Sequence, residues 1–229
     1  MLFLNKKKYI ILSFALVINS LFTVNTFSQN HKPFQGKLVY SVEMADTAMQ
    51  KMIPARTMVI YTNDTIVRIE NETNQLGKQI IIKHTVLNKS ILLLSSGDKN
   101  YAIQTNLNKK SDSTSLKPSE SKYIYKKKFG RKKIVNKKAN RITIQLKGQK
   151  KEIEILYFKD YSTKYIDAYN EIPGLPVRYY IQTEDGIVVY TLIQMENKTI
   201  NRDLFGIPSD YKRVTFDQFL DEVIIPSQK

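Results

Sequence analysis

The chain has 229 residues, with 36 Lys and Arg against 21 Asp and Glu for a net charge of +15, and it has no cysteine and two histidines. The lack of thiols excludes disulfides and thiolate metal sites, so the core alone must supply the stability of the fold. A chain of this length fits one domain with a substantial core.

The first residues have the pattern of an export signal. Three lysines at 6–8 precede an apolar run at 9–24, and a Thr-Phe-Ser tripeptide with small outer residues follows. This order is typical of a cleavable signal peptide, because the run is short for a bilayer span of about 20 residues. We therefore expect a signal peptide at 1–28 cleaved near Ser28-Gln29, a single β-rich domain at 29–229, and a periplasmic or secreted location. A permanent membrane anchor is the alternative.

Alternation of apolar and polar residues with a period of two dominates the chain after the signal. Leu38, Tyr40 and Val42 share one side of a predicted strand, while Ser41 and Glu43 lie on the other. Such alternation is typical of half-buried β-strands. The strands predicted in the first half are 37–44, 58–61, 65–70, 78–86, 90–95 and 100–105.

The positive charge belongs to one region. Residues 107–151 hold 16 Lys and Arg against Asp112 and Glu120, a net charge of +14. The region begins with a polar stretch that predicts a long loop. We predict strands after this loop at 123–128, 141–146 and 152–158, with turns at Gly130 and Gly148.

The last part of the chain has the clearest hairpin signal. Predicted strands at 177–183 and 187–194 flank an Asp-Gly pair, which supplies the positive φ angles of a tight hairpin. Thr215 and Gln218 have the spacing of a capping box, which predicts a short helix. Ten to twelve strands with little helix predict a mainly β fold, a curved antiparallel sheet or half-barrel with one or two short helices.

No catalytic constellation is visible in the sequence. The chain lacks the nucleophile elbow, the zinc-binding His-Glu-x-x-His pattern and a phosphate-binding Gly-rich loop. His31 and His84 are far apart, and Glu152 and Glu154 share one strand face, where carboxylates usually face water. We predict no metal, no cofactor and no enzymatic activity. The enzymatic alternative would need titratable groups that converge in a polar cleft.

Apolar residues on a curved sheet can form a groove that binds ligands by burying apolar surface. We therefore predict a carrier-like protein for a lipid, an acyl chain or a hydrophobic polypeptide. Arg68, two residues from Glu70, could hold a ligand headgroup, and the alternative for this pair is an exposed ion pair of little energy. The candidate ligand-binding residues are Val39, Tyr40, Met58, Ile60, Arg68, Ile80, Ile82, Tyr179 and Ile181.

A second candidate surface combines lysines with nearby tyrosines. Such a mixture can bind nucleic acid, but the export signal argues against that partner. An anionic envelope surface, with peripheral membrane contact, or an acidic protein suits the location better. The alternative function is thus a structural or assembly subunit of a cell-envelope machine, and a solvated hairpin without a partner also stays open. The candidate residues are Lys126, Lys127, Lys128, Arg131, Lys132, Lys133, Lys137 and Lys138.

Three Asp-Ser/Thr-x triplets mark candidate modification sites. They resemble the O-glycosylation acceptor that Bacteroidota use on exported proteins. All three fall in predicted turns or loops, where a bulky glycan can be accommodated. The acceptor residues are Thr47, Thr65 and Ser113.

Several blocks of the sequence are similar to a known family. The most specific block is Ile172-Pro173-Gly174-Leu175-Pro176, and Phe34-Gln35-Gly36-Lys37-Leu38 and Leu204-Phe205-Gly206-Ile207-Pro208 precede and follow it at family-like spacing. The chain resembles the GLPGLI-like exported proteins of Bacteroidota. This resemblance implies a sheet similar to the half-barrel of the lipoprotein carrier LolA and an envelope location, but no activity. The chain departs from the family pattern at Val177-Arg178 and in the lysine density of 122–138.

Overall fold

A computed structural model describes most of the chain after residue 30. The described residues are 31–52, 55–73, 77–87, 89–96, 98–106, 123–148, 150, 152–166, 168–169, 171–183 and 186–224. The predicted signal peptide and the polar loop that carries Ser113 lie outside them.

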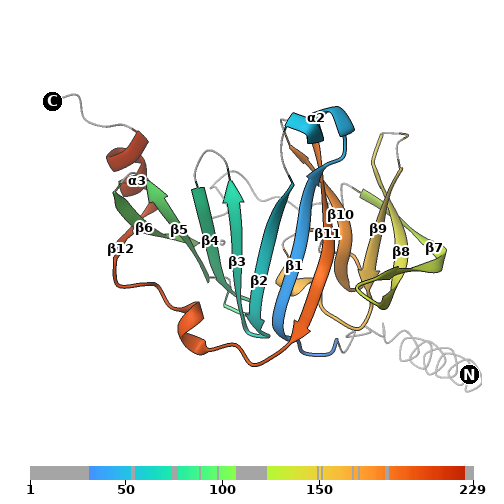
Figure 1. The fold of residues 1–229 in the computed structure, drawn as a ribbon, viewed down its shortest axis with the longest axis horizontal. Coiled ribbons are helices and arrows are strands. Elements are labelled where there is room, and N and C mark those ends of the chain that lie inside the picture. The colour runs from blue at the N-terminus through green and yellow to red at the C-terminus, as the bar shows by residue number, and fades with distance from the viewer. Residues whose placement is uncertain are drawn as a thin grey trace, which may run out of the picture. The chain divides into compact units, whose positions relative to one another are not determined.

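Twelve strands of the described residues form one curved sheet that does not close (Figure 1). Their order is β12-β6-β5-β4-β3-β2-β1-β11-β10-β9-β8-β7. Neighbours are antiparallel except β12 and β6, which run parallel. The prediction of a mainly β fold with a curved antiparallel sheet is therefore confirmed.

The first six strands are β1 (Gln35–Met44), β2 (Arg56–Asn63), β3 (Ile66–Thr73), β4 (Gly77–His84), β5 (Lys89–Ser96) and β6 (Lys99–Asn106). The other six are β7 (Tyr123–Ile134), β8 (Lys137–Leu146), β9 (Glu152–Phe158), β10 (Leu175–Thr183), β11 (Gly186–Asn197) and β12 (Tyr211–Val214). The short helical elements are α2 (Thr47–Met52), η1 (Thr163–Tyr165), η2 (Arg202–Phe205), α3 (Phe216–Phe219) and η3 (Leu220–Ile224). The predicted capping box of α3 is present, since Thr215 and Gln218 each bond the other's backbone N–H.

Apolar side chains cover both faces of the sheet. Leu38 lies opposite Ile60, Ile60 opposite Ile69, and Ile69 opposite Ile81, so these four share one face. They belong, except for the half-buried Ile81, to the buried part of the largest core cluster, which continues into β8, β9 and β10. We call this the inner face, because residues from distant parts of the curved sheet meet on it. The opposite, outer face has a smaller cluster made of Ile80, Ile82, Leu93 and Ala102.

The predicted turn at Gly130 is wrong. Strand β7 continues through Gly130 with a bulge between Lys128 and Arg131, and the chain turns at Val135 and Asn136. Both turn residues have positive φ, 39° and 63°, as a two-residue hairpin loop requires. Glycine in a strand commonly marks a bulge rather than a turn.

The Ile-Pro-Gly-Leu-Pro block has a structural role. Gly174 has a φ of +152°, and a Cβ added there would lie 2.3 Å from the carbonyl oxygen of Phe158. Ile172 and Leu175 on either side are buried. The block thus brings the chain against the end of β9 and starts β10.

The two edges of the sheet are protected differently. Strand β12 has four residues, while β7 has twelve. The exposed side chains of β7 include a run of lysines, and lysine on an edge strand opposes pairing with other chains. Part of the lysine density is therefore explained by the position of β7 at the edge.

Among the residues that the structure describes, no helix has the length and apolar character needed to cross a bilayer.

Candidate functional site

Three tyrosines from neighbouring strands form a wall on the inner face. The rings of Tyr179 and Tyr190 stack with centroids 4.8 Å apart, and Tyr40 meets Tyr179 edge-on at 6.0 Å. The Tyr40 hydroxyl donates to the carbonyl of Pro176 at 2.8 Å. Burial raises the pKa of both Tyr40 and Tyr179 well above the usual value. These hydroxyls stay neutral at ordinary pH, so the wall suits packing rather than proton transfer.

An apolar pocket of about 250 Å³ opens beside this wall. Asn71 is the lining residue with a side-chain amide, and Tyr179 and Tyr190 are the lining residues that carry a hydroxyl. An apolar lining with few polar groups is typical of small-molecule sites. The lining residues are Met58, Ile60, Ile69, Asn71, Ile81, Ile166, Ala168, Tyr179, Ile181 and Tyr190.

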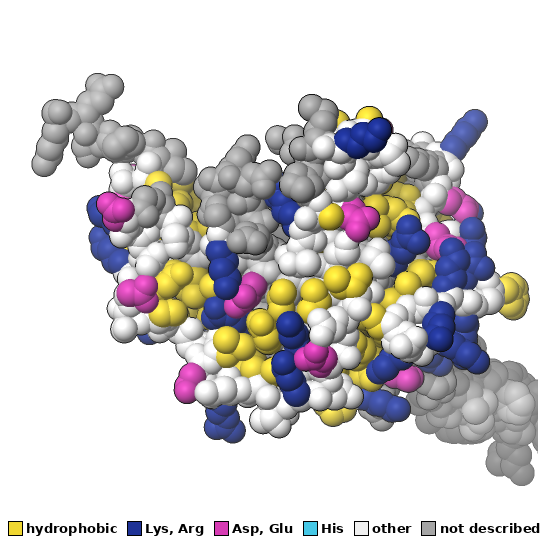
Figure 2. Space-filling view, in the orientation of Figure 1, with side chains coloured by type: hydrophobic (Ala, Val, Ile, Leu, Met, Phe, Trp, Pro, Cys, Tyr) yellow, Lys and Arg dark blue, Asp and Glu magenta, His cyan; other side chains and the backbone are white. Residues whose placement is uncertain are grey.

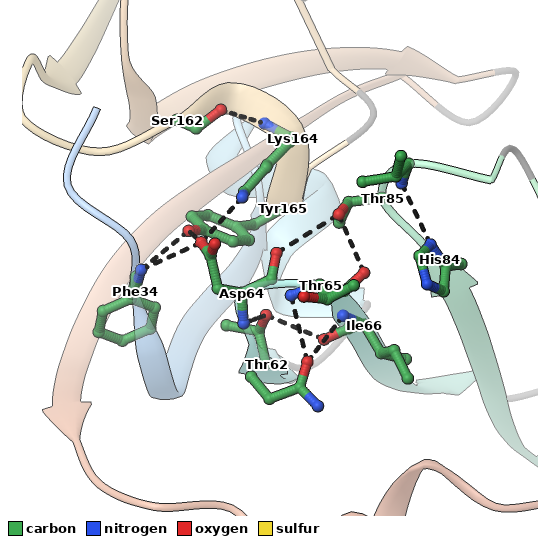
Figure 3. Close-up of polar contacts among 12 residues, drawn as sticks. Phe34, Thr62, Asp64, Thr65, Ile66, His84, Thr85, Ser162, Lys164 and Tyr165 are labelled. Carbon is green, nitrogen blue, oxygen red and sulfur yellow. Dashed lines mark hydrogen bonds and ion pairs between the residues drawn. The ribbon is translucent and has the colours of Figure 1, made fainter. Parts of the chain in front are cut away.

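The pocket wall that carries Ile166 and Ala168 is not part of the sheet. It follows η1, which is tied to the β2–β3 turn by a group of contacts that we call the Asp64 latch (Figure 3). Asp64 Oδ1 accepts hydrogen bonds from the Phe34 backbone N–H at 3.2 Å and from the Tyr165 hydroxyl, and it pairs with Lys164 Nζ at 2.8 Å. The latch thereby joins three segments that are distant in sequence.

Electrostatics favour the charged form of Asp64 in the latch. Partial burial alone would raise the pKa of Asp64, but the hydrogen bonds from Lys164, Tyr165 and Phe34 outweigh it and leave the pKa below the usual value. Burial, and then the hydrogen bond to Asp64, raise the pKa of Tyr165. Asp64 has a φ of 75°, which Asp and Asn tolerate better than most residues. This geometry explains an Asp at a strand-joining turn without any catalytic role.

The structure separates the nine predicted ligand-binding residues onto two faces, because adjacent residues of a strand point in opposite directions. The inner face holds Tyr40, Met58, Ile60, Tyr179 and Ile181, of which all but Tyr40 line the pocket. The outer face holds Val39, Arg68, Ile80 and Ile82. A single site built from all nine is therefore not formed.

Arg68 anchors a covering segment on the outer face. Its Nε contacts Glu70 at 2.6 Å and its guanidinium donates to the Leu204 carbonyl at 2.9 Å. Its side chain is 10% exposed, so the expected alternative of an exposed ion pair is wrong. Burial alone would raise the pKa of Glu70, but hydrogen bonds from Arg68 and Lys78 hold it below the usual value. The pair thus fixes η2 against β3.

Sequence reasoning missed Ile69, Asn71, Ile81 and Tyr190 and the covering residues Ile166 and Ala168. Ile69, Asn71 and Ile81 follow from the pairing register once Met58 and Ile60 are placed on the inner face, and Tyr190 lies opposite Tyr179. The cover had no sequence signal, since residues 161–171 lack regular alternation.

The predicted basic surface lies at the β7–β9 end of the sheet, where Lys and Arg side chains gather (Figure 2). Two of its lysines are compensated, since Lys126 pairs with Glu152 at 2.8 Å and Lys132 with Glu154 at 2.5 Å. Lys137 donates to the Tyr161 hydroxyl at 3.0 Å. The remaining five have no ion pair with a described residue: Lys127, Lys128, Arg131, Lys133 and Lys138.

The bulge in β7 presents an aromatic side chain to solvent. Phe129 is 99% exposed. Arg141 donates to the Phe129 carbonyl at 3.0 Å and also holds Glu154, which fixes the bulged backbone. The bulge of the β7–β8 hairpin therefore holds an exposed phenylalanine among cationic side chains.

The two histidines have local roles. His84 Nδ1 accepts from the backbone N–H groups of Val86 and Leu87, closing the turn after β4. His31 Nδ1 lies 3.2 Å from the Lys159 carbonyl. Within the described ranges, no group of three or more His, Asp or Glu side chains could hold a metal ion.

The candidate glycosylation residues Thr47 and Thr65 are exposed. Thr47 begins α2, where Asp46 Oδ1 accepts the Ala48 N–H at 2.7 Å. Thr65 lies in the β2–β3 turn. Glycosylation of either residue stays a prediction.

Comparisons with known proteins give structural likeness without a function. None of the known family models matches the chain, and no curated protein matches it. Two crystal forms of PNGF-II are similar in structure at 10% sequence identity, with TM-scores of 0.49 and 0.48. They cover 82% and 81% of this chain, which spans about a third of theirs, 33% and 32%. The resemblance to GLPGLI-like proteins stays a prediction.

Proposed function

We propose that the protein is a non-enzymatic binding protein that holds an apolar group in the inner-face pocket. The observation that supports this function is an opening of about 250 Å³ with apolar walls on the inner face. An apolar occupant would gain affinity from the surface it buries there. Asn71 and the tyrosine hydroxyls would orient a polar end.

The volume limits the class of ligand. The pocket exceeds the cavity of about 150 Å³ that holds benzene in an engineered protein, and it lies below the range of about 300–1,000 Å³ for drug-sized ligands. The end of an acyl chain or one bulky apolar side chain of a polypeptide fits this range better than a whole lipid. The export pattern of the N-terminus supports an envelope or extracellular setting for this carrier-like role.

Titration with a polarity-sensitive apolar dye tests the proposal. Ala168→Phe fills the pocket from its covering segment, so dye affinity should fall by about tenfold or more, equivalent to about 1.4 kcal/mol. Ala48→Phe adds the same side chain at an exposed position of α2 and should leave affinity unchanged. Equal affinity in both variants, or no dye binding to the unmodified chain, would rule the pocket out.

The exposed Phe129 supports a second candidate function, docking on an anionic surface through the β7–β8 hairpin. Aromatic side chains at a membrane interface, flanked by cations, give reversible attachment to anionic lipids. Phe129→Ser should then reduce co-sedimentation with anionic vesicles, whereas Phe216→Ser, at a side chain 53% exposed on α3, should not. Equal sedimentation of both variants would contradict this role.

A further inference from the structure

A second recess lies at the turn end of the β7–β8 hairpin, away from the apolar pocket. It has a volume of about 540 Å³. Its cations are Lys32, Arg131, Lys137, Lys138 and Lys159. Asp160 is its one acidic lining residue, and Tyr161, Phe158 and Asn140 complete the lining.

The charges of this recess differ from those on the rest of the hairpin. Lys126 pairs with Glu152 of β9, and Lys132 and Arg141 share Glu154 of the same strand. Among the described residues, Lys32, Arg131, Lys138 and Lys159 have no ion-pair partner. Five cations held together with only one carboxylate, Asp160, repel one another, and a bound anion would relieve this repulsion.

The backbone around the recess is fixed. Lys32 forms a bridge with Tyr161, and its N–H donates to the Asp160 carbonyl at 2.7 Å. The Tyr161 carbonyl accepts the Leu175 N–H at 2.8 Å. Lys137 Nζ is held by the Tyr161 hydroxyl at 3.0 Å and lies 5.0 Å from the centre of that ring. The backbone that carries Lys32, Lys159 and Asp160 is therefore fixed before any ligand arrives, and Lys137 is also held through its side chain.

We propose that this recess binds a compact polyanion, a group that carries two or more phosphates. Arg131 can bind one phosphate through two parallel hydrogen bonds. The lysine ammonium groups can attract a second phosphate as point charges. Asp160 would accept a hydrogen bond from a hydroxyl of the same ligand. The phosphates could belong to a soluble molecule or to a lipid headgroup, and both sources share this chemistry.

Calorimetric titration of the full chain with inorganic tripolyphosphate tests the site, together with sedimentation on phosphatidylcholine vesicles that contain phosphatidic acid. Arg131→Gln with Lys138→Gln removes two recess cations. Lys127→Gln with Lys128→Gln removes the same charge from the same hairpin outside the recess. Dye binding to the apolar pocket should be unchanged in both, which separates this site from the carrier function.

We expect one tripolyphosphate per chain and a loss of about tenfold in affinity in the recess variant alone, as removal of two partly exposed charge contacts implies. Loss of vesicle binding in the recess variant alone would support the site with a headgroup as its source. Equal losses of tripolyphosphate affinity in both variants, or no binding of either probe, would overturn the proposal, whereas vesicle losses in both variants would assign vesicle attachment to the Phe129 surface. If the recess variant fails to fold, Lys159→Gln, in an exposed turn, decides by the same criteria.

Discussion

The Asp64 latch makes a quantitative prediction for Asp64→Asn. The exchange removes the charge while keeping an acceptor oxygen, and asparagine tolerates the positive φ of this position. Hydrogen bonds to charged groups contribute about 1.5–3 kcal/mol, and ion pairs near the surface about 1 kcal/mol or less. The Asp64 and Lys164 side chains are 30% and 34% exposed, so we expect a net loss of about 1–2 kcal/mol in the free energy of unfolding.

Thermal unfolding followed by circular dichroism measures this loss. For a domain of this size, 1 kcal/mol lowers Tm by about 2–4 °C, so the variant should melt roughly 2–8 °C lower near neutral pH. The Asp64 pKa is lowered in the folded state. Its stabilisation is therefore complete above the unfolded pKa of about 3.9 and is lost as pH falls through the lower folded pKa.

The difference in Tm between Asp64→Asn and the unmodified chain should accordingly shrink in acid. Asp98→Asn, at an exposed turn residue, serves as the matched control and should not change Tm at either pH. An Asp64→Asn protein as stable as the unmodified chain at neutral pH would refute the reasoning. A Tm difference that persists undiminished at the lowest pH would refute it as well.

Three further substitutions test other parts of the fold. Tyr40→Phe leaves the buried Pro176 carbonyl without its partner and should cost about 1–3 kcal/mol in denaturant unfolding, whereas Tyr61→Phe, at a half-exposed ring, should cost little. Gly174→Ala places a Cβ 2.3 Å from a carbonyl oxygen and should lower the free energy of unfolding by about 3 kcal/mol or more. Gly148→Ala, with open space around it, should lower it by about 1–2 kcal/mol. A similar Tm for the two variants would contradict the close approach of Gly174 to the Phe158 carbonyl. Lys127→Val with Lys128→Val removes charges from the β7 edge and should promote aggregation, detected by light scattering; an unchanged monomer would show that these lysines have another purpose.

The strands could be predicted because the alternation of apolar and polar residues within a strand depends on which face of that strand is buried. Twelve strands agree with the expected ten to twelve, and the chain turns at Gly148 and between the predicted strands 58–61 and 65–70. The short α2 and the four-residue β12 were not expected. Both are too short for periodicity to distinguish them from loops.

The assignment of residues to faces could not be predicted with the same success. Ile80, Ile81 and Ile82 are apolar at three successive positions, so alternation cannot choose which of them faces inward. Val39 and Tyr40 pose the same problem at a register shift between β1 and β11. Both faces of this sheet are covered by other segments of the chain, and the coverings come from residues distant in sequence.

The cationic recess shows the same limit. Arg131, Lys137 and Lys138 belong to a conspicuous lysine run, whereas Lys32 and Lys159 reach the recess only through the bridge between Lys32 and Tyr161. Charge density identified the hairpin as a candidate surface. Only the fold separates its compensated lysines from those that line a cavity.

Methyl NMR of isoleucine-labelled protein during addition of a medium-chain fatty acid tests the apolar pocket most directly, because isoleucines lie on both faces of the same strands. The account predicts saturable shifts for the methyls of Ile60, Ile69, Ile81 and Ile181, with those of Ile80 and Ile82 unchanged. Shifts confined to the outer-face methyls, or none at all, would contradict it.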